Sequence, residues 1–397
     1  MLGEKIIIST RIAMVILLIF GTFSLANAAG NIHIGTLEIH PFASVEQKYD
    51  DNIFLEPKDQ EDDDWITTTT LGLDLNMPII PGREEDFTFK AKYAASFLKF
   101  WDYTKQDRVD HNISALADFK FSNDFTFKIE DNFQKTADSP NNELTALEKR
   151  FCNIAQTVFG YMREKIGFDF GYKNIRDDYN NLNDLDRYEH VFTTTGYYQL
   201  FPKTSIFGEY NFGKIIYDNN NTNSDSKYHQ YRLGIKGQIA PKLSGLAKAG
   251  YKETDYKNTG KKNFKSFTTF ANVTYDLKDR TTLNIFAERS SEESTYSSNS
   301  YFEYNKIGLK IDHELLEKLF LVSGGYYQLN KYPDETTEDS TTAKRKDKLW
   351  DGSIGIRYEM KEWLFLETDY EYKQRDSKFA TFDYKDNRFS TKVSLIF

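Results

Sequence analysis

The sequence predicts an all-β fold, namely a transmembrane, antiparallel, up-and-down β-barrel of about 18 strands, or about 16 as the alternative count. Three observations lead to this prediction: a long series of segments in which apolar and polar residues alternate, a secretion signal ahead of them, and a last segment that ends on an aromatic residue. Alternation with a period of two places the apolar side chains on one face of a strand. The segments are close to the roughly 9–11 residues with which a tilted strand crosses a bilayer.

The segment 87–97 illustrates the alternation. Phe89 and Tyr93 fall on one face of the expected strand, whereas Lys90 and Lys92 fall on the other. Comparable segments recur up to the carboxyl terminus, and the connections between them alternate between short and long. The long polar connections are expected at 50–64, 136–149, 174–186, 218–227, 290–300 and 330–347. Short turns at one end and long loops at the other are typical of the periplasmic and extracellular ends of an outer-membrane barrel, so we expect both termini in the periplasm.

The amino terminus has the features of a secretion signal. Basic residues precede an apolar run over 12–20, and Ala26 and Ala28 are the small residues that signal peptidase requires. We therefore expect residues 1–28 to be a cleaved signal peptide and residues 29–397 to form the barrel. A retained membrane anchor is the alternative, but the apolar run is short for a spanning helix.

The composition excludes several classes of protein. Mean hydropathy is low, at −0.62, yet the chain carries 26 tyrosines and 32 phenylalanines. A membrane barrel combines these features, because it needs aromatic belts and a polar interior. Cys152 is the single cysteine, which excludes an internal disulfide and a thiolate metal cluster. The net charge of −9 argues against nucleic acid as a partner.

The last segment, 384–397, alternates between apolar and polar residues and stops at Phe397. A final strand with an aromatic carboxyl-terminal residue resembles the terminal strand of bacterial outer-membrane barrels, which the barrel-assembly machinery recognises. Phe397 is therefore the expected assembly signal. The last strand of a soluble sandwich is the alternative, although strands in such proteins are usually shorter.

Strand parity also predicts which basic side chains face the lumen. The pore-lining candidates are Lys90, Lys92, Lys128, Arg232, Lys236, Lys248, Lys252, Lys306, Lys310, Arg357 and Lys392. A basic wall lowers the barrier for anionic solutes. The alternative is a mixed lumen whose charges pair across strands, since a register slip of one residue would move a side chain to the lipid side.

No catalytic function is expected. The chain has none of the motifs Gly-x-Ser-x-Gly, His-Glu-x-x-His or a glycine-rich phosphate loop. Eight acidic residues crowd the stretch 50–64, where divalent-cation binding is one hypothesis and a solvated loop is the favoured one. We therefore expect no enzyme, no cofactor and no metal centre.

The opening of the barrel region carries a family resemblance. The strings His40-Pro41-Phe42-Ala43-Ser44-Val45 and Tyr49-Asp50-Asp51-Asn52-Ile53-Phe54, followed by Asp64-Trp65-Ile66-Thr67-Thr68, resemble the start of the putative β-barrel porin type 2 family. The resemblance implies an outer-membrane channel or export component for exopolysaccharide, without identifying the polymer. It also implies polysaccharide and periplasmic export proteins as partners, beside outer-membrane lipid and lipopolysaccharide.

Two functions remain open at this point. One is a passive pore in the bacterial outer membrane for anionic exopolysaccharide, favoured by the basic bias of the expected lumen. The other is a non-conducting structural barrel, or one that binds a surface polymer, whose long loops occlude the lumen.

Overall fold

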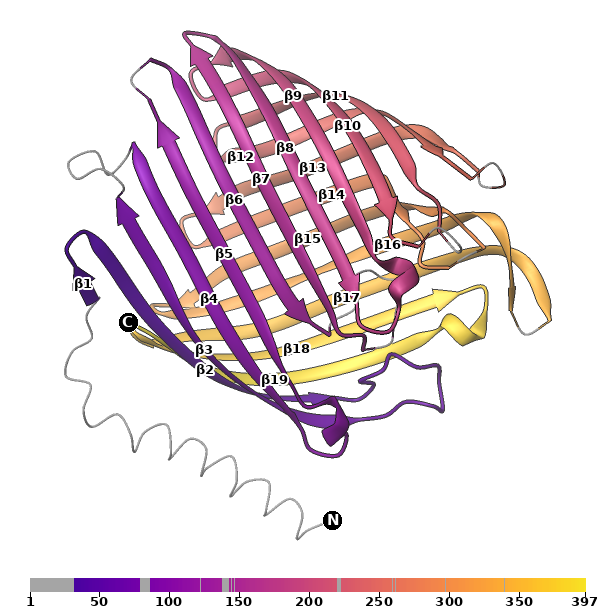
Figure 1. The fold of residues 1–397 in the computed structure, drawn as a ribbon. Coiled ribbons are helices and arrows are strands. Elements are labelled where there is room, and N and C mark those ends of the chain that lie inside the picture. Colours follow the sequence, from indigo (N-terminus) through magenta and orange to yellow (C-terminus); the bar gives the residue numbers. More distant parts are fainter. Residues whose placement is uncertain are drawn as a thin grey trace.

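The computed structural model describes residues 32–397, except for 79–85, 122, 138–142, 144, 146, 220–222, 259, 261, 297 and 339. The expected signal peptide, 1–28, lies outside the described residues. Within them the chain forms nineteen strands and three short 3-10 turns, and the strands wrap into one closed barrel (Figure 1). None of the described helical segments is long and apolar enough to cross a membrane.

The barrel wall consists of eighteen strands in the part of the chain that the structure describes. The first nine are β2 (Leu37–Asp50), β3 (Asp64–Pro78), β4 (Phe87–Phe100), β5 (Arg108–Lys120), β6 (Phe125–Thr136), β7 (Arg150–Arg163), β8 (Ile166–Tyr179), β9 (Arg187–Phe201) and β10 (Thr204–Tyr217). The second nine are β11 (Ser226–Ala240), β12 (Leu243–Tyr256), β13 (Phe264–Lys278), β14 (Thr281–Glu293), β15 (Tyr301–Leu316), β16 (Leu319–Glu338), β17 (Thr341–Lys361), β18 (Leu364–Ser377) and β19 (Tyr384–Ile396).

Every wall strand pairs antiparallel with the next one, and β19 closes the barrel against β2, with Val393 opposite Val45. A further short strand, β1 (Ile32–Ile34), forms a hairpin with the start of β2. Closure gives every wall strand two neighbours over most of its length, as a lipid environment requires. The predicted barrel of 18 strands is thereby confirmed.

The two ends of the barrel differ in their connections. At one end, here the turn end, most connections have two residues, and Glu164, Lys242 and Lys318 adopt positive φ values of 53°, 62° and 66° in them. Both described termini lie at this end (Figure 1), where the Phe397 backbone N–H donates to the Pro41 carbonyl. The other end, here the loop end, carries the longer connections and all three 3-10 turns of the described chain.

The two faces of the wall differ as the alternation predicts. Outward residues are apolar and exposed; Leu233 and Tyr231 are 75% and 57% exposed. Their neighbours Arg232 and Gln230 point to the opposite, inner face, where Gln230 is buried and donates to Thr268 Oγ1. An apolar outer face with a polar inner one is the arrangement of a membrane barrel and the reverse of a soluble sandwich.

Two expected loops are strands instead. β16 and β17 continue through 330–347 as one long hairpin that projects past its neighbours (Figure 1). Because this stretch is polar on both faces, the sequence predicted a loop. Cross-strand contacts stabilise the hairpin instead: Glu335 lies opposite Lys344, and the Thr337 and Thr342 hydroxyls form a 2.8 Å hydrogen bond. Likewise β8 extends to Tyr179, so its loop is shorter than expected.

The string Tyr49–Phe54 has a structural explanation. Asn52 is fully buried, and its amide donates to the carbonyls of Glu56 and Lys385, each at 2.9 Å. Ile53 packs with Ile66 and Phe100 in a small apolar cluster. These contacts fix the first loop against the last strand at the seam where the barrel closes.

In several loops at the loop end, an aspartate carboxylate accepts a hydrogen bond from the backbone N–H at the end of the preceding strand. Asp186 Oδ1 accepts the backbone N–H of Tyr179 at 2.7 Å, and Asp107 Oδ1 accepts that of Phe100 at 2.9 Å. Each aspartate stands directly before the next strand, so its side chain ends one strand and positions the start of the next. These bonds satisfy backbone donors that the strand ladder leaves open.

Candidate functional site

The inner face of β10, β11 and β12 carries a cluster of paired charges. Glu209 of β10 receives an ion pair from Arg232 of β11 and another, at 3.0 Å, from Lys248 of β12. All three side chains are less than one-fifth exposed. The contact between β10 and β12 spans two strands, as the concave face of the wall favours because side chains converge there.

Other candidate basic residues also meet carboxylates. Six of the eleven have a carboxylate oxygen within 4.0 Å: Lys92 with Asp74, Lys128 with Glu130, Arg232 and Lys248 with Glu209, Lys310 with Asp312, and Arg357 with Glu359. Much of the basic charge on this face is therefore balanced locally, as in the mixed lumen considered from sequence.

Three further lysines lie over aromatic rings. Lys236 Nζ is 3.5 Å from the centroid of the Tyr197 ring, and Lys306 Nζ is 3.8 Å from that of Tyr326. Lys252 Nζ stands 4.7 Å from the Tyr228 ring and also donates to Ser291 Oγ at 3.2 Å. A cation over an aromatic face is stabilised by the negative face of the ring, and none of these three lysines has a carboxylate oxygen within 4.0 Å among the described residues.

The last two candidates lie at the turn end. Lys90 and Lys392 line a cavity of about 590 Å³ together with Lys92, His40 and further residues of β2, β3, β4 and β19. Neither Lys90 nor Lys392 forms an ion pair with any residue that the structure describes. This cavity is separate from the Glu209 cluster, so the structure does not gather all eleven candidates into one site.

Phe397, the expected assembly signal, lies next to this cavity at the seam. Its ring stacks on Trp363 with centroids 6.2 Å apart, and its carbonyl oxygen is 3.2 Å from His40 Nδ1. The carboxyl-terminal residue is thus held against both the strand before it and the strand that closes the barrel.

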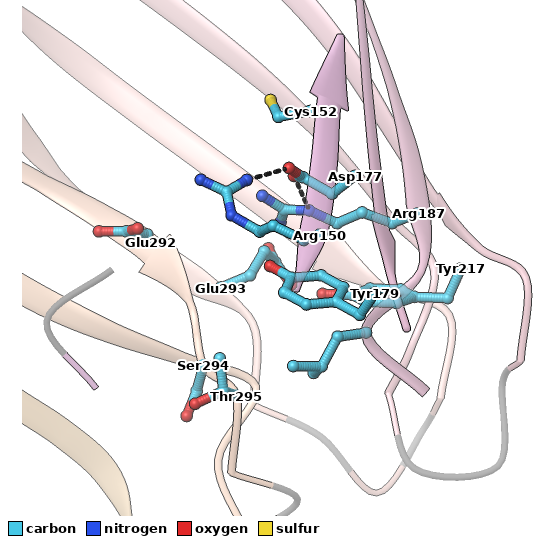
Figure 2. Close-up of a pocket in the computed structure, with 11 residues that line it drawn as sticks. Arg150, Cys152, Asp177, Tyr179, Arg187, Tyr217, Glu292, Glu293, Ser294 and Thr295 are labelled. Atoms are coloured by element: carbon cyan, nitrogen blue, oxygen red, sulfur yellow. Dashed lines mark hydrogen bonds and ion pairs between the residues drawn. The ribbon is translucent and has the colours of Figure 1, made fainter. Parts of the chain in front are cut away.

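A second cavity, of about 190 Å³, lies near the loop end (Figure 2). Asp177 holds its two arginines, accepting from Arg150 Nη1 at 2.9 Å and from Arg187 Nε at 3.2 Å. Figure 2 shows Glu292 and Glu293 on the side away from Asp177, so the cavity has a cationic and an anionic wall.

The anionic wall exists because the end of β14 leaves its neighbour. β14 pairs with β13 only as far as Arg289, whereas its last four residues pair with β15 alone. The freed segment turns into the lumen, where Glu293 Oε1 accepts from Tyr256 Oη at 2.9 Å. Cys152 also lines this cavity, and it is the single cysteine of the chain.

Glu143, a described residue of the connection between β6 and β7, contacts the opposite side of the barrel. Glu143 in this loop is fully buried and accepts the Ser294 hydroxyl at 2.9 Å and the Thr295 backbone N–H at 2.7 Å. Its carbonyl oxygen accepts from Arg375 Nη1 of β18 at 3.2 Å. Seven strands separate β7 from β17 on the shorter way round the wall, so Glu143 lies across the lumen from β7.

Arg345 forms the centre of this contact, which we call the loop-end core. Its guanidinium donates from Nε to Asp347 at 2.9 Å, lies 3.9 Å from Glu143, and stacks 3.8 Å from the Phe382 ring centroid. The side chains of Arg345 and Asp347 are at most 1% exposed. Burial raises the pKa of the Glu143 carboxyl, while the Thr295 N–H and the Arg345 charge oppose this rise.

Sequence reasoning did not find Glu143, Arg345 or the pair of arginines on Asp177. One signal was available: Arg345 and Asp347 are two residues apart and therefore share a strand face. No local pattern marks Glu143, because its partners among the described residues are 151 or more residues away. The acids of the first loop bind backbone and side-chain donors; Asp51, for example, accepts the Asn387 N–H. Among the described residues no group of three potential ligands could hold a metal ion.

Comparison with known proteins gives one family match. The family model described as "Putative beta-barrel porin 2" matches residues 26–397. No curated protein matches the sequence.

Several solved barrels are similar in shape. The outer membrane protein OpdK of Pseudomonas aeruginosa is 11% identical, with a TM-score of 0.49 over 90% of this chain and 99% of that one. The outer membrane channel DcaP of Acinetobacter baumannii is 15% identical, with a TM-score of 0.48 over 93% and 100%. At these values the similarity says nothing about solutes, and the fold assignment rests on the strand pairing described above.

Proposed function

The chain belongs to the putative β-barrel porin 2 family, and from this premise we propose that it forms a pore through the bacterial outer membrane, with both termini in the periplasm. The observation that carries the proposal is the closed wall of strands with an apolar outer face and a charged inner face. An apolar outer face is unfavourable in water, whereas in a bilayer it contacts the hydrocarbon chains of the lipids. The proposed activity is passage of solutes, without a catalytic step.

The proposed solute class is an anionic, hydroxyl-rich polymer, that is, an acidic exopolysaccharide. The support comes from the lysines that have no carboxylate oxygen within 4.0 Å among the described residues: Lys90 and Lys392 at the turn end, and Lys236, Lys252 and Lys306 over aromatic rings. Their positive field would attract carboxylate groups of the polymer. The aromatic rings beside them would accept the apolar faces of sugar rings.

A specific observation favours a second candidate, a barrel that does not conduct at rest. The loop-end core joins the β6–β7 loop to β17 and β18 and thereby crosses the lumen. In this candidate the barrel serves a structural role or binds a surface polymer through its loops. The two candidates differ in whether solute passes while Glu143 stays bound.

Solute flux into proteoliposomes distinguishes them. The refolded protein would be tested with neutral and uronate-containing oligosaccharides of equal length. The proposal expects both to enter and the uronates to enter faster. Equal rates would contradict the anionic preference, and no flux from folded protein would favour the second candidate.

Cys152 provides an independent check of solute access. It lines the cavity at the loop end and is the only thiol in the chain. If solutes reach this cavity, an anionic and a cationic methanethiosulfonate added from the loop end should both modify it. A Cys152→Ser chain serves as the unlabelled control, and a thiol that resists both reagents would contradict access.

We propose that Phe397 is read by the barrel-assembly machinery and that periplasmic export proteins deliver the polymer. The support is the position of the carboxyl terminus at the turn end beside the seam (Figure 1). Phe397→Ser should lower the amount of folded, heat-modifiable barrel in cells, whereas a conservative Phe397→Tyr change should not. Equal folded amounts of both variants would contradict the assignment.

A further inference from the structure

The outer face of the barrel carries three equivalent pairs of tyrosine and histidine. The hydroxyl-to-Nδ1 distances are 3.0 Å for Tyr93–His111, 2.8 Å for Tyr172–His190 and 2.8 Å for Tyr210–His229. In every pair the tyrosine stands seven residues before the end of its strand and the histidine three residues after the start of the next. The three pairs therefore lie at one height, close to the loop end.

These pairs belong to the apolar outer surface. Tyr93 is 40% exposed, and Phe192, which packs on Tyr172 with ring centroids 5.0 Å apart, is 51% exposed. Aromatic residues at this height of a spanning barrel lie where the hydrocarbon meets the polar headgroups. A histidine there faces the headgroup layer.

Hydrogen bonding defines the tautomer of His190. Its Nδ1 is 2.8 Å from the Tyr172 hydroxyl and 3.2 Å from Asn174 Nδ2. An amide nitrogen only donates, so Nδ1 is the acceptor and the ring proton sits on Nε2. Within the described chain Nε2 has no hydrogen-bond partner, so an N–H group points outward from the wall.

A lysine stands directly opposite two of the three histidines. Lys135 of β6 pairs in register with His111, and Lys214 of β10 pairs with His190. Both lysines are exposed, and neither forms an ion pair with a described residue. Tyr93, His111 and Lys135 thus form one triplet on three consecutive strands, and Tyr172, His190 and Lys214 form a second. The third histidine lies opposite Glu253 and lacks this feature.

The second triplet has an additional basic residue. Lys227 of β11 lies directly opposite Lys214, and it is also exposed. Like charges directly opposite on one face of a sheet destabilise it. Asp255 of β12, directly opposite Lys227 on its other side, offsets part of this repulsion, and an anion bound between the two ammonium groups would offset the rest.

We propose that the two Tyr–His–Lys triplets bind the phosphate groups of a phosphorylated lipid such as lipid A. The ammonium group supplies charge, the Nε2–H donates to a phosphate oxygen, and the acyl chains lie against outward rings such as Phe192. The proposal rests on the proposed function only in placing this face in a membrane; it makes no use of the pore.

Lipid binding to the full-length mature barrel in detergent tests the proposal, with native mass spectrometry as the readout. Diphosphorylated lipid A is expected to bind, and dephosphorylated lipid A to bind more weakly. In the double variant Lys135→Gln/Lys214→Gln the affinity for diphosphorylated lipid A should fall about fivefold for each lysine removed. The matched control Lys265→Gln/Lys348→Gln removes two outward lysines that have carboxylate partners, and it should bind as the wild type does.

Three outcomes would overturn the proposal. They are equal binding of the two lipids, an unchanged affinity in the Lys135→Gln/Lys214→Gln variant, or binding of inorganic phosphate as tight as that of the lipid. The same variant should retain wild-type solute flux. Solute flux therefore tests the proposed pore, whereas lipid affinity tests the triplets. A negative result in one measurement leaves the other proposal intact.

Discussion

Charged side chains are buried and paired at one end of the lumen and lack carboxylate partners at the other. At the loop end Glu143, Arg345 and Asp347 are almost completely buried and bonded to one another. At the turn end Lys90 and Lys392 line an open cavity and meet no carboxylate among the described residues.

This difference shows how one end of a barrel can hold a loop in place while the other end presents charge to a solute. A buried ion pair stabilises little by itself, but removing one partner is costly because the other charge is left in a low dielectric. The loop-end core is therefore suited to holding a loop in one position. Unpaired lysines in a wet cavity leave a field that a passing solute can meet, so the turn end is suited to selecting solutes.

The largest expected effect comes from breaking the loop-end core. Arg345→Met would leave Asp347 and Glu143 buried without their cation, which we expect to cost about 3–5 kcal/mol in the free energy of unfolding. Urea unfolding in detergent measures this cost. The control Lys346→Met changes the exposed neighbour on the same strand and should have almost no effect. Equal stability of the two variants would show that the core does not hold the loop.

A change at the turn end should alter selectivity and leave stability intact. Lys90→Glu combined with Lys392→Glu would reverse the field of the cavity, and we expect the ratio of anion to cation permeability to fall by a factor on the order of 10. Reversal potentials under a salt gradient measure the ratio. Lys105→Glu combined with Lys378→Glu, both on exposed connections at the loop end, is the charge-matched control. An equal shift of the permeability ratio in both variants would contradict the claim that the turn end selects the solute.

The pH dependence of the loop sharpens the comparison further. Because burial raises the pKa of Glu143, the closed loop holds the proton of this group more tightly than a released loop does. This stabilisation is complete below the ordinary pKa of glutamate and is lost as the pH rises through the raised value. Conductance should therefore increase as the pH rises above the ordinary pKa of glutamate and through the raised pKa of Glu143.

Conductance recorded over this range is the check. Glu143→Gln cannot titrate and should give a flat profile. A flat profile from the wild type, or a sloping one from the variant, would assign the pH response to another group.

The smallest effect is expected at the carboxylates that close the loops. Asp186→Ala removes the acceptor for the Tyr179 N–H and should cost about 1 kcal/mol of stability. Urea unfolding again provides the measurement, with Lys149→Ala on the neighbouring loop as control. A loss as large as that of Arg345→Met would place the main constraint of the loop end in the short loops and not in the core.

The fold could be predicted because alternation extends over nearly every strand. Apolar residues on one face specify the strand, its length and its inner and outer sides, as the segment around Phe89 and Lys90 shows. The hairpin of β16 and β17 escaped prediction, since outside the bilayer neither of its faces needs to be apolar. Its Thr337–Thr342 contact is visible only once the strands are paired.

The interior could be predicted only in part. Parity predicts one shared face for Lys248 and Glu209, but their contact depends on the stagger between β10 and β12, which alternation does not define. Glu143 lies in a loop without a period, and tertiary contacts alone place it beside Arg345. Long-range contacts of this kind leave no trace in a local pattern.

The central claim is that the charged inner wall forms a pore whose loop end is restrained by the core. Single-channel recording of the refolded protein in a planar bilayer tests it most directly, with the wild type and Arg345→Met compared under one salt gradient. The account predicts anion-preferring current in the wild type and larger, more frequent openings in the variant. Absence of current from both proteins, each shown to be folded by heat-modifiable migration, would contradict it.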